Sequence, residues 1–336
     1  MAVTIDSVSV YGAGSWGTAL ALQLARNGLQ VSLWDINKER AAQLEQRREN
    51  TGYLPGITFP DNLHCSGDLS VVAAHSSDHL IVVPSHGFRD LLLGLQPLLN
   101  VNDRLCWATK GLELETGKLL HEVAESVFPE HPYGIVSGPT FATEVARGMP
   151  TAMTVATSDS QFTQEIARAF HGGNYRVYTS DDVVGVELGG AIKNVLAIAA
   201  GISDGLGFGA NARAAIITRG LAEIMRLGEC LNAQPTTLMG LAGVGDLVLT
   251  CTDDQSRNRR LGLALGAGQT MTEAIAGIGQ AVEGVKSAQA VGKLAERIGV
   301  EMPICQTVYR ILYQGLLPRE AVEELISRTQ KSEFQP

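Results

Sequence analysis

The sequence predicts a doubly wound parallel α/β sheet followed by an all-helical second domain. Strand and helix signals alternate through the first half of the chain, and a glycine-rich loop joins the first strand to the first helix. Strand signals then fade after about residue 180. We therefore expect one domain over residues 1–180 and a second over residues 181–336.

Each expected strand of the first half is a short run rich in β-branched or aromatic residues. The first lies at residues 8–11, and an apolar stretch with helical periodicity follows at residues 18–27. Further strands are expected at residues 31–34, 80–83, 105–108, 135–137, 152–156 and 175–178, with a helix at 163–170 before the last. Alternating strands and helices with short connections indicate a parallel sheet.

Long helical patterns dominate the second half. They are expected at residues 183–202, 211–231, 272–275, 282–298, 303–313 and 318–328. This change of pattern places the domain boundary near residues 179–184.

Composition excludes several classes of protein. The chain has 336 residues, of which 45% are hydrophobic, and its formal net charge is -9. An acidic chain argues against a nucleic-acid partner and against a polybasic membrane module. Lys193 interrupts the longest apolar run, which stays short of the roughly 18 residues of a membrane span. No signal-peptide pattern is visible, so we expect a cytoplasmic protein without membrane insertion.

Cysteine and histidine spacings give no metal or disulfide pattern. The five cysteines form no C-x-x-C pair, and the seven histidines form no H-E-x-x-H motif. His75 and His79 are four residues apart, but no third ligand is obvious nearby. We expect no metal and a reducing environment.

The glycine loop is a candidate dinucleotide site. Gly12-x-Gly14-x-x-Gly17 lies directly between a strand and a helix, as in a Rossmann-like fold. The first glycine would make the tight turn, the second would admit a pyrophosphate, and the third would allow close packing of helix and strand. We therefore expect NAD or NADP as the cofactor.

Asp35 follows the second strand, about 20 residues beyond the loop. An acid there can accept hydrogen bonds from the ribose hydroxyls of NAD, and it would repel the extra phosphate of NADP. The alternative is a helix N-cap, for which Asn37 is an equally good candidate. The residues favour NAD, but the nearby cations Lys38 and Arg40 leave the choice open.

Lys193 follows two glycines on an expected helix. Helical side chains lean over the positions three and four residues earlier, here Gly190 and Gly189. The amine would then cross a bare patch where a ligand could lie against the backbone. The alternative is a close helix–helix contact with Lys193 reaching solvent.

Two further segments carry candidate substrate residues. Lys110 follows a strand at the sheet edge where such folds bind ligands, although a lysine in such a loop can simply be solvated. Ser256 is an expected N-cap, with Arg257 and Asn258 in the first turn of its helix, which together suit a phosphate. The alternative there is a solvated basic face, which we expect for Arg259 or Arg260.

Several ordered motifs together resemble one family. They are Gly12-Ala-Gly-Ser-Trp-Gly-Thr-Ala, Val82-Val-Pro-Ser-His86, Ala108-Thr-Lys-Gly-Leu-Glu113, Ser137-Gly-Pro-Thr-Phe-Ala142, Leu188-Gly-Gly-Ala-Ile-Lys-Asn194, Gly243-Val-Gly-Asp-Leu247, Ser256-Arg-Asn-Arg259 and Gly279-Gln-Ala-Val-Glu-Gly284. They span nearly the whole chain, which resembles the bacterial-type NAD(P)-dependent glycerol-3-phosphate dehydrogenases. This implies a helical second domain like the C-terminal domain of 6-phosphogluconate dehydrogenase.

The resemblance also implies an activity and a set of site residues. The activity is reversible hydride transfer between sn-glycerol 3-phosphate and dihydroxyacetone phosphate, which would supply phospholipid synthesis. Lys193 would be the general acid and base, and a homodimer is expected. The substrate would contact Lys110, Gly138, Thr140, Lys193, Asp246, Ser256, Arg257 and Asn258. The cofactor would contact Gly12, Gly14, Ser15, Trp16, Gly17, Asp35, Lys110, Ala142, Arg257 and Glu283.

One departure from the family and two alternative functions stay open. Family members that use NADP often have a neutral or basic residue where this chain has Asp35 and Ile36. A two-domain dehydrogenase of 3-hydroxy acids or sugar acids would share the fold and a helix-borne lysine. A dinucleotide-binding sensor would bind the cofactor without turnover.

Overall fold

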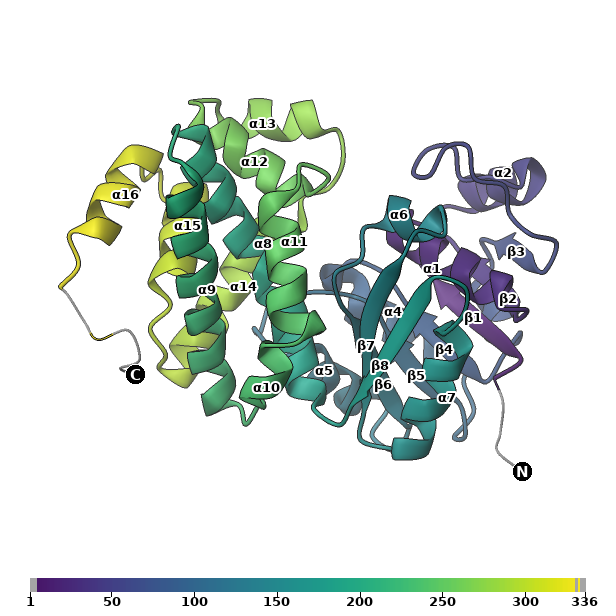
Figure 1. Cartoon of the computed structure of the whole chain (residues 1–336). Helices are drawn as coiled ribbons and strands as arrows, with labels where there is room; N and C mark the ends of the chain where they lie inside the picture. The colour runs from purple at the N-terminus through teal and green to yellow at the C-terminus, as the bar shows by residue number, and fades with distance from the viewer. Residues whose placement is uncertain (1–4, 330–331, 333–336) are drawn as a thin grey trace. The chain divides into compact units, whose positions relative to one another are not determined.

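The computed structural model describes residues 5–329 and 332, and it forms two compact units (Figure 1). The N-terminal unit comprises Met1–Lys110 and Leu119–Glu187, and the helical unit comprises Gly111–Lys118 and Leu188–Pro336. The predicted domains, 1–180 and 181–336, stay a prediction. A short segment that follows Lys110 in the chain thus packs within the helical unit.

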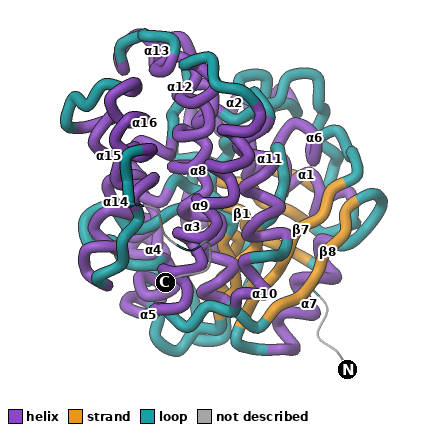
Figure 2. Tube along the Cα trace, turned by 60° about the vertical axis from the view of Figure 1, so that its left-hand side comes forward, coloured by secondary structure: helices purple, strands orange, loops and turns teal. Residues whose placement is uncertain are grey.

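The N-terminal unit is built on one eight-stranded sheet in the order β3-β2-β1-β4-β5-β6-β7-β8. Its strands, orange in Figure 2, are β1 (Ser7–Tyr11), β2 (Gln30–Trp34), β3 (Leu63–Ser66), β4 (Asp78–Ile81), β5 (Arg104–Trp107), β6 (Tyr133–Ser137), β7 (Thr151–Thr157) and β8 (Tyr175–Ser180). All neighbouring strands pair in parallel except β6 and β7, which are antiparallel. The predicted fold class is confirmed. The short β3 is a strand that the sequence patterns do not predict.

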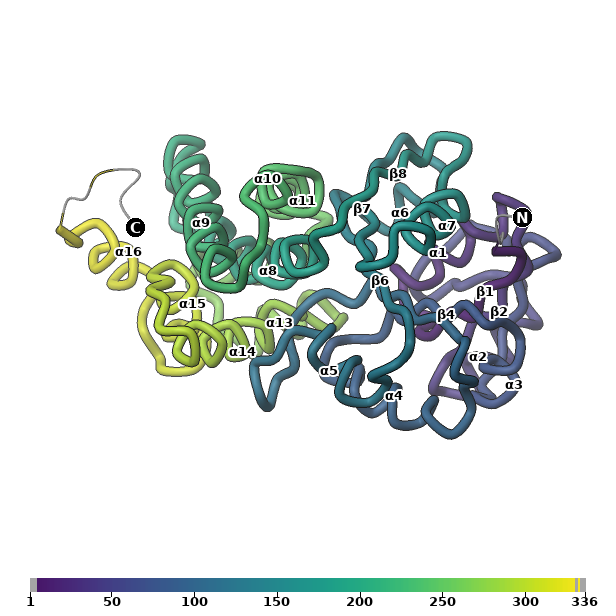
Figure 3. Tube along the Cα trace, turned by 90° about the horizontal axis from the view of Figure 1, so that it is seen from below, coloured from purple at the N-terminus to yellow at the C-terminus, as the bar shows by residue number. Residues whose placement is uncertain are grey.

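Helices cover both faces of this sheet. They are α1 (Ser15–Arg26), α2 (Lys38–Arg47), α3 (Leu69–Ala73), α4 (Phe88–Leu95), α5 (Leu120–Val127), α6 (Ala142–Ala146) and α7 (Ser160–Phe170). Helices α1, α6 and α7 lie on one face, and α3, α4 and α5 lie on the other (Figure 3). Val10, Leu20 and Leu33, from β1, α1 and β2, belong to the buried core, which fixes the loop after β1 on a rigid base.

The register aligns the carboxyl ends of the central strands. Tyr11 at the end of β1 pairs with Trp34 of β2 and with Ile81 of β4. The loops that follow these strands therefore leave the same edge of the sheet, which is the edge where open α/β folds bind ligands.

The helical unit is organised around α8 (Val183–Gly205). Its other helices are α9 (Ala210–Cys230), α10 (Pro235–Leu238), α11 (Asp246–Thr252), α12 (Arg257–Gly266), α13 (Met271–Ile278), α14 (Glu283–Ile298), α15 (Pro303–Tyr313) and α16 (Pro318–Ile326). Helix α8 is long and apolar enough to cross a membrane, but 94% of its most apolar window is buried inside the protein. It is the core helix of this unit.

Candidate active site

The glycine loop has the shape that a dinucleotide requires. Gly12 has a φ of 115°, and a Cβ on Gly17 would lie 1.9 Å from the Gly12 carbonyl oxygen, so neither position admits a side chain. At Gly14, the N-cap of α1, a Cβ would meet nothing within 4 Å. The loop is thus tightly packed behind and open in front, where a pyrophosphate would approach the N-terminus of α1.

Ser15 and Trp16 are the first two residues of α1, and both are half-buried. The Trp16 Nε1 group is buried and has no hydrogen-bond partner among the described residues. Together with the cradle left open at Gly14, these residues fit a nicotinamide dinucleotide.

Asp35 lies at the end of β2, but its carboxylate is buried, with 1% of the side chain exposed. Its Oδ1 accepts the backbone N–H of Asn37 at 2.8 Å, and its Oδ2 accepts the Nε–H of Arg40 at 2.7 Å. Asn37 is the N-cap of α2 and accepts the Arg40 backbone N–H at 2.9 Å, so Asn37 and not Asp35 caps this helix. Asp35 instead forms an ion pair with Arg40.

Four other predicted ligand residues lie together in the N-terminal unit. Lys110 follows β5, and its Nζ donates to the carbonyl oxygen of Gly138 at 3.3 Å. The Thr140 hydroxyl donates to the same oxygen at 3.2 Å, and Ala142 begins α6 two residues later. This cluster joins the end of β5 to the loop after β6.

Lys193 and Asp246 form a buried pair in the helical unit. The Lys193 Nζ on α8 donates to Asp246 Oδ1 at 2.5 Å and to the Thr250 hydroxyl at 3.0 Å. The Thr250 hydroxyl donates in turn to the Asp246 carbonyl oxygen at 2.6 Å. Lys193 is 8% exposed and Asp246 is fully buried, so the amine is held in one direction by partners on α11.

A glycine contact brings this pair together. A Cβ on Gly189 would lie 2.2 Å from the Ala242 carbonyl oxygen, because the π-helical turn η2 (Leu241–Gly245) runs directly against α8 there. The bare patch expected beside Lys193 is therefore wrong at Gly189, where backbone fills the space. Asp246 follows this turn at once, so the close approach places its carboxylate on the lysine.

The predicted phosphate segment begins α12. Ser256 is its N-cap, as predicted, and its hydroxyl accepts the Arg259 N–H at 3.2 Å. Asn258 is buried and bridges two helices, because its Nδ2 donates to Asn194 Oδ1 at 2.9 Å and its Oδ1 accepts the Gly284 N–H at 2.8 Å. Arg257 is half-buried, and its Nη1 lies 3.5 Å from Gln280 Oε1.

The two remaining arginines of this segment differ. Arg260 is exposed, as the solvated alternative expects. Arg259 is buried and pairs with Asp204 and Asp254. Glu283, the last predicted cofactor residue, is half-buried at the first position of α14.

Sequence reasoning assigned no partner to three residues of these clusters. Thr250 lies one helical turn after Asp246 on α11. This i, i+4 spacing is visible in the sequence, but it indicates a site only once Lys193 is known to lie next to both residues. Asn194 directly follows Lys193, and Arg40 lies five residues after Asp35, yet only the fold shows which partner each one takes.

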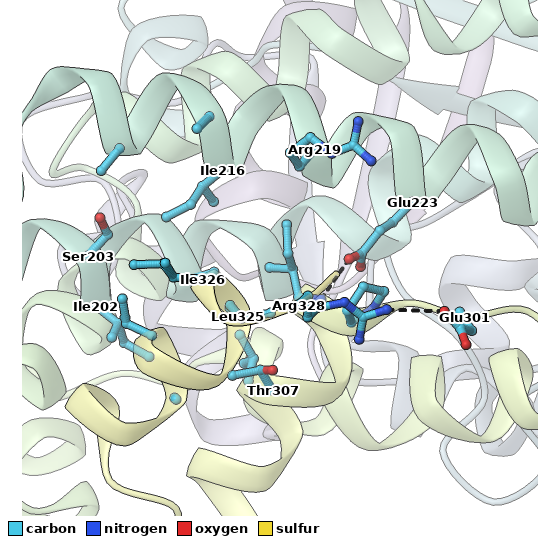
Figure 4. A pocket seen from close by; sticks show the side chains of 18 of the residues that line it. Ile202, Ser203, Ile216, Arg219, Glu223, Glu301, Thr307, Leu325, Ile326 and Arg328 are labelled. Atoms are coloured by element: carbon cyan, nitrogen blue, oxygen red, sulfur yellow. Dashed lines mark hydrogen bonds and ion pairs between the residues drawn. The ribbon is translucent and has the colours of Figure 1, made fainter. Parts of the chain in front are cut away.

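A separate hollow of about 1490 Å³ lies between α8, α9, α15 and α16, and no predicted site residue lines it. Figure 4 shows Glu223, Ile216 and Ile326 among the residues that line it. Glu223 accepts the backbone N–H groups of Ile304 and Cys305 at 2.6 and 3.2 Å. Among the described residues, no group of three or more His, Cys, Asp and Glu could hold a metal ion.

Comparison with known proteins gives consistent matches over both halves of the chain. Residues 7–163 match the family model for the N-terminus of NAD-dependent glycerol-3-phosphate dehydrogenase, and residues 182–323 match the model for its C-terminus. A relative in Thioalkalivibrio sulfidiphilus named glycerol-3-phosphate dehydrogenase [NAD(P)+] is 58% identical, over 97% of this chain and 98% of its own. A relative of the same name in Vibrio cholerae is 54% identical, over 97% and 95%.

A solved structure of the same family is similar to this chain over nearly its whole length. The crystal structure of glycerol-3-phosphate dehydrogenase from Coxiella burnetii is 48% identical, with a TM-score of 0.94, over 96% of this chain and 99% of its own.

Proposed function

Because this chain belongs to the NAD-dependent glycerol-3-phosphate dehydrogenase family, we propose that Lys193 supplies the proton in its reversible hydride transfer. The protein is an oxidoreductase that acts on a CH–OH group with NAD(H) or NADP(H). Its reaction interconverts sn-glycerol 3-phosphate and dihydroxyacetone phosphate. The buried contact between Lys193 and Asp246 is the observation that carries the proposed role.

When bound, the nicotinamide cofactor supplies the hydride or accepts it. Gly12, Gly14 and Gly17 would let the pyrophosphate approach the backbone, and Ser15 and Trp16, at the N-terminus of α1, would hold it there. Further cofactor contacts are proposed for Lys110, Ala142, Arg257 and Glu283, by the resemblance of their motifs.

Reduction of the ketone places negative charge on its carbonyl oxygen. An ammonium group next to that oxygen stabilises the charge and then donates the proton, and the neutral amine takes the proton back in the reverse reaction. Asp246 and Thr250 fix the direction of the Lys193 Nζ. A buried pair also excludes water, which strengthens the electrostatic stabilisation of the developing charge.

The substrate phosphate needs a separate set of donors. We assign it to Ser256, Arg257 and Asn258, the N-cap and the first two residues of the ten-residue α12, where N-terminal backbone N–H groups and a guanidinium would suit a phosphate. Lys110, Gly138 and Thr140 are assigned to the substrate from the N-terminal unit. Binding energy from the phosphate would position the reacting carbon.

The proposal also covers the location, the oligomeric state and the metabolic role of the enzyme. The enzyme works in the cytoplasm, forms a homodimer, and supplies glycerol 3-phosphate for phospholipid synthesis. They rest on the family and on the composition of the chain.

The test is a spectrophotometric assay of dihydroxyacetone phosphate reduction with NADH and NADPH in parallel, beside a panel of 2- and 3-keto acids. Turnover should require the phosphorylated ketone. Lys193→Met should lower kcat roughly 100-fold or more, the scale of lost acid–base help. The exposed Lys286 on α14 provides the matched control, and Lys286→Met should leave kcat unchanged. Wild-type turnover by purified Lys193→Met would overturn the role.

A further inference from the structure

Lys293 on α14 fastens the segment that directly follows Lys110. We call this segment, Gly111–Lys118, the strap, and it packs within the helical unit. The Lys293 Nζ donates to the backbone carbonyl oxygens of Leu114 at 2.9 Å and of Glu115 at 3.0 Å. Both acceptors are backbone groups, so these contacts fix the path of the chain. Hydrogen bonds from an ammonium group are also stronger than those between neutral groups.

A second contact with α14 depends on the glycine of the strap. Gly117 is buried and has a φ of 67°. A Cβ there would lie 3.1 Å from the Leu294 backbone nitrogen and 3.2 Å from the Lys293 Cβ. A side chain at this position would be both strained and crowded. The strap therefore lies directly on the helical turn that carries Lys293.

The strap is also braced internally. The Glu113 N–H donates to the Lys118 carbonyl oxygen and the Gly117 N–H donates to the Glu113 carbonyl oxygen, both at 2.9 Å. The Thr116 hydroxyl donates to the buried Glu113 carboxylate and accepts the Lys118 N–H at 3.1 Å. These bonds close the strap into one loop, so an anchor at any point of it positions the whole loop.

The far end of the strap is held by a different residue. Helix α5 begins at Leu120, and Glu187 Oε1 on α8 accepts the N–H groups of Leu120 and His121 at 2.6 and 3.2 Å. Glu187 Oε2 lies 2.6 Å from His121 Nδ1. Loss of the Lys293 contacts would leave this end in place. The movement that it frees would fall on the near end of the strap, at Lys110.

Only a short length of chain joins Lys110 to this anchor. Leu114 is four residues after Lys110, and an extended chain spans at most about 14 Å over that length. The Lys110 Nζ donates to the Gly138 carbonyl oxygen at 3.3 Å, in the cluster assigned to the substrate above. A group misplaced by about 1 Å in an active site can lose much of its effect.

We propose that Lys293 is a positioning residue for the reaction: it pins the strap to α14 and so holds Lys110 where the phosphorylated ketone binds. In this role Lys293 contacts neither substrate nor cofactor and acts only through Lys110. The inference rests on the proposed function, which assigns Lys110 to the substrate.

Steady-state kinetics with dihydroxyacetone phosphate test the role. Lys293→Met should raise KM roughly 5- to 30-fold, the factor that one or two lost hydrogen bonds supply. The value of kcat should change by less than about 2-fold, because the lost binding energy is shared by ground state and transition state. Lys293→Arg keeps a cation with several N–H donors and should return KM to within about 3-fold of wild type. Lys286→Met, an exposed lysine on the same helix, should change neither constant.

A double-mutant cycle with Lys110→Met separates action through Lys110 from a general effect. Once residue 110 is methionine, adding Lys293→Met should raise KM by less than about 2-fold, because the group that Lys293 positions is gone. Full multiplication of the two effects would overturn the proposal. An unchanged KM in Lys293→Met, or a fall in kcat alone, would do the same.

Hydrogen exchange tests the anchor without turnover. In Lys293→Met the Glu113 and Gly117 amide protons should exchange faster, while those of Leu120 and His121 stay as protected as in wild type. Unchanged exchange throughout the strap would show that Lys293 does not anchor it. A wild-type enzyme that does not reduce dihydroxyacetone phosphate would refute the proposed function and leave this readout intact, so the two failures are distinguishable.

Discussion

Gly14 in the loop of the N-terminal unit and Gly189 on α8 in the helical unit show two different uses of a missing side chain. At Gly14 the absent side chain leaves open space, with nothing within 4 Å of the position that a Cβ would take. At Gly189 the absent side chain lets the Ala242 carbonyl approach to 2.2 Å of that position. One glycine keeps a surface free for a ligand, and the other lets two backbones meet.

The difference shows how a glycine can act on a reaction from a distance. The contact at Gly189 touches no expected ligand, but it brings η2 and then Asp246 onto Lys193. Under the proposed cofactor assignment, the space at Gly14 would act directly, because the pyrophosphate would approach the backbone there. Substitution of Gly189 should therefore mainly lower stability, whereas substitution of Gly14 should mainly weaken cofactor binding.

Gly189→Ala should have the largest effect on stability. Backbone atoms cannot yield as a flexible side chain does, so the new methyl group must push η2 away from α8. We expect the free energy of unfolding to fall by at least about 3 kcal/mol, at the upper end of overpacking costs. Urea denaturation measures this loss, and kcat should fall as well because Asp246 moves from Lys193. A variant with wild-type stability would mean that the contact is loose.

Two buried carboxylates, one in each unit, are held in different ways. Burial raises the pKa of Glu165 in α7, but hydrogen bonds from Arg104 and Gln161 outweigh it and leave the pKa below its usual range. Burial raises the pKa of Glu223 in α9 to about 7, and the backbone N–H groups of Ile304 and Cys305 offset only part of the shift. A hydrogen-bonded arginine makes the difference between these two carboxylates, and Glu223 should show the consequence near neutral pH.

Glu223→Gln tests that consequence. The folded state of the wild type holds the Glu223 proton up to about pH 7, whereas the unfolded chain releases it near 4.5. Stability from this group is thus fully present at low pH and is lost as pH rises towards 7. Between pH 5 and 8 the variant should gain about 2 to 3 kcal/mol relative to wild type, since one pKa unit corresponds to about 1.4 kcal/mol. A constant difference in unfolding free energy across this range would contradict it.

The sequence predicts local features well where one residue carries one physical requirement. The loop Gly12 to Gly17 and the N-cap Ser256 could be placed because their spacing has a single common use. Partners distant in sequence could not be placed: Asp246 and Thr250 reach Lys193 only because η2 packs on Gly189. The same limit applies to Asp35, whose position was predicted while its pairing with Arg40 depends on a side-chain orientation that spacing does not encode.

Gly14→Ala should damage binding and spare folding. The φ of -75° and ψ of -176° at this position suit alanine, and no atom within 4 Å opposes the methyl group. The free energy of unfolding should stay within about 0.5 kcal/mol of wild type. Binding of NADH and NADPH should weaken together by roughly 10-fold, equivalent to about 1.4 kcal/mol. Unchanged dissociation constants in calorimetry would show that the pyrophosphate does not use this surface.

Gly292→Ala in α14 should have the smallest effect of these substitutions. It should raise the free energy of unfolding, whereas Gly189→Ala should lower it. Both glycines are interior to long helices, but a Cβ on Gly292 would meet nothing within 4 Å. Alanine costs less backbone entropy than glycine in a helix, so the free energy of unfolding should rise by about 0.5 to 1 kcal/mol. Cofactor binding and kcat should not change. If Gly292→Ala destabilised the protein as Gly189→Ala does, helix interiors here would reject any added methyl group, and the cost at Gly189 could no longer be assigned to its contact with Ala242.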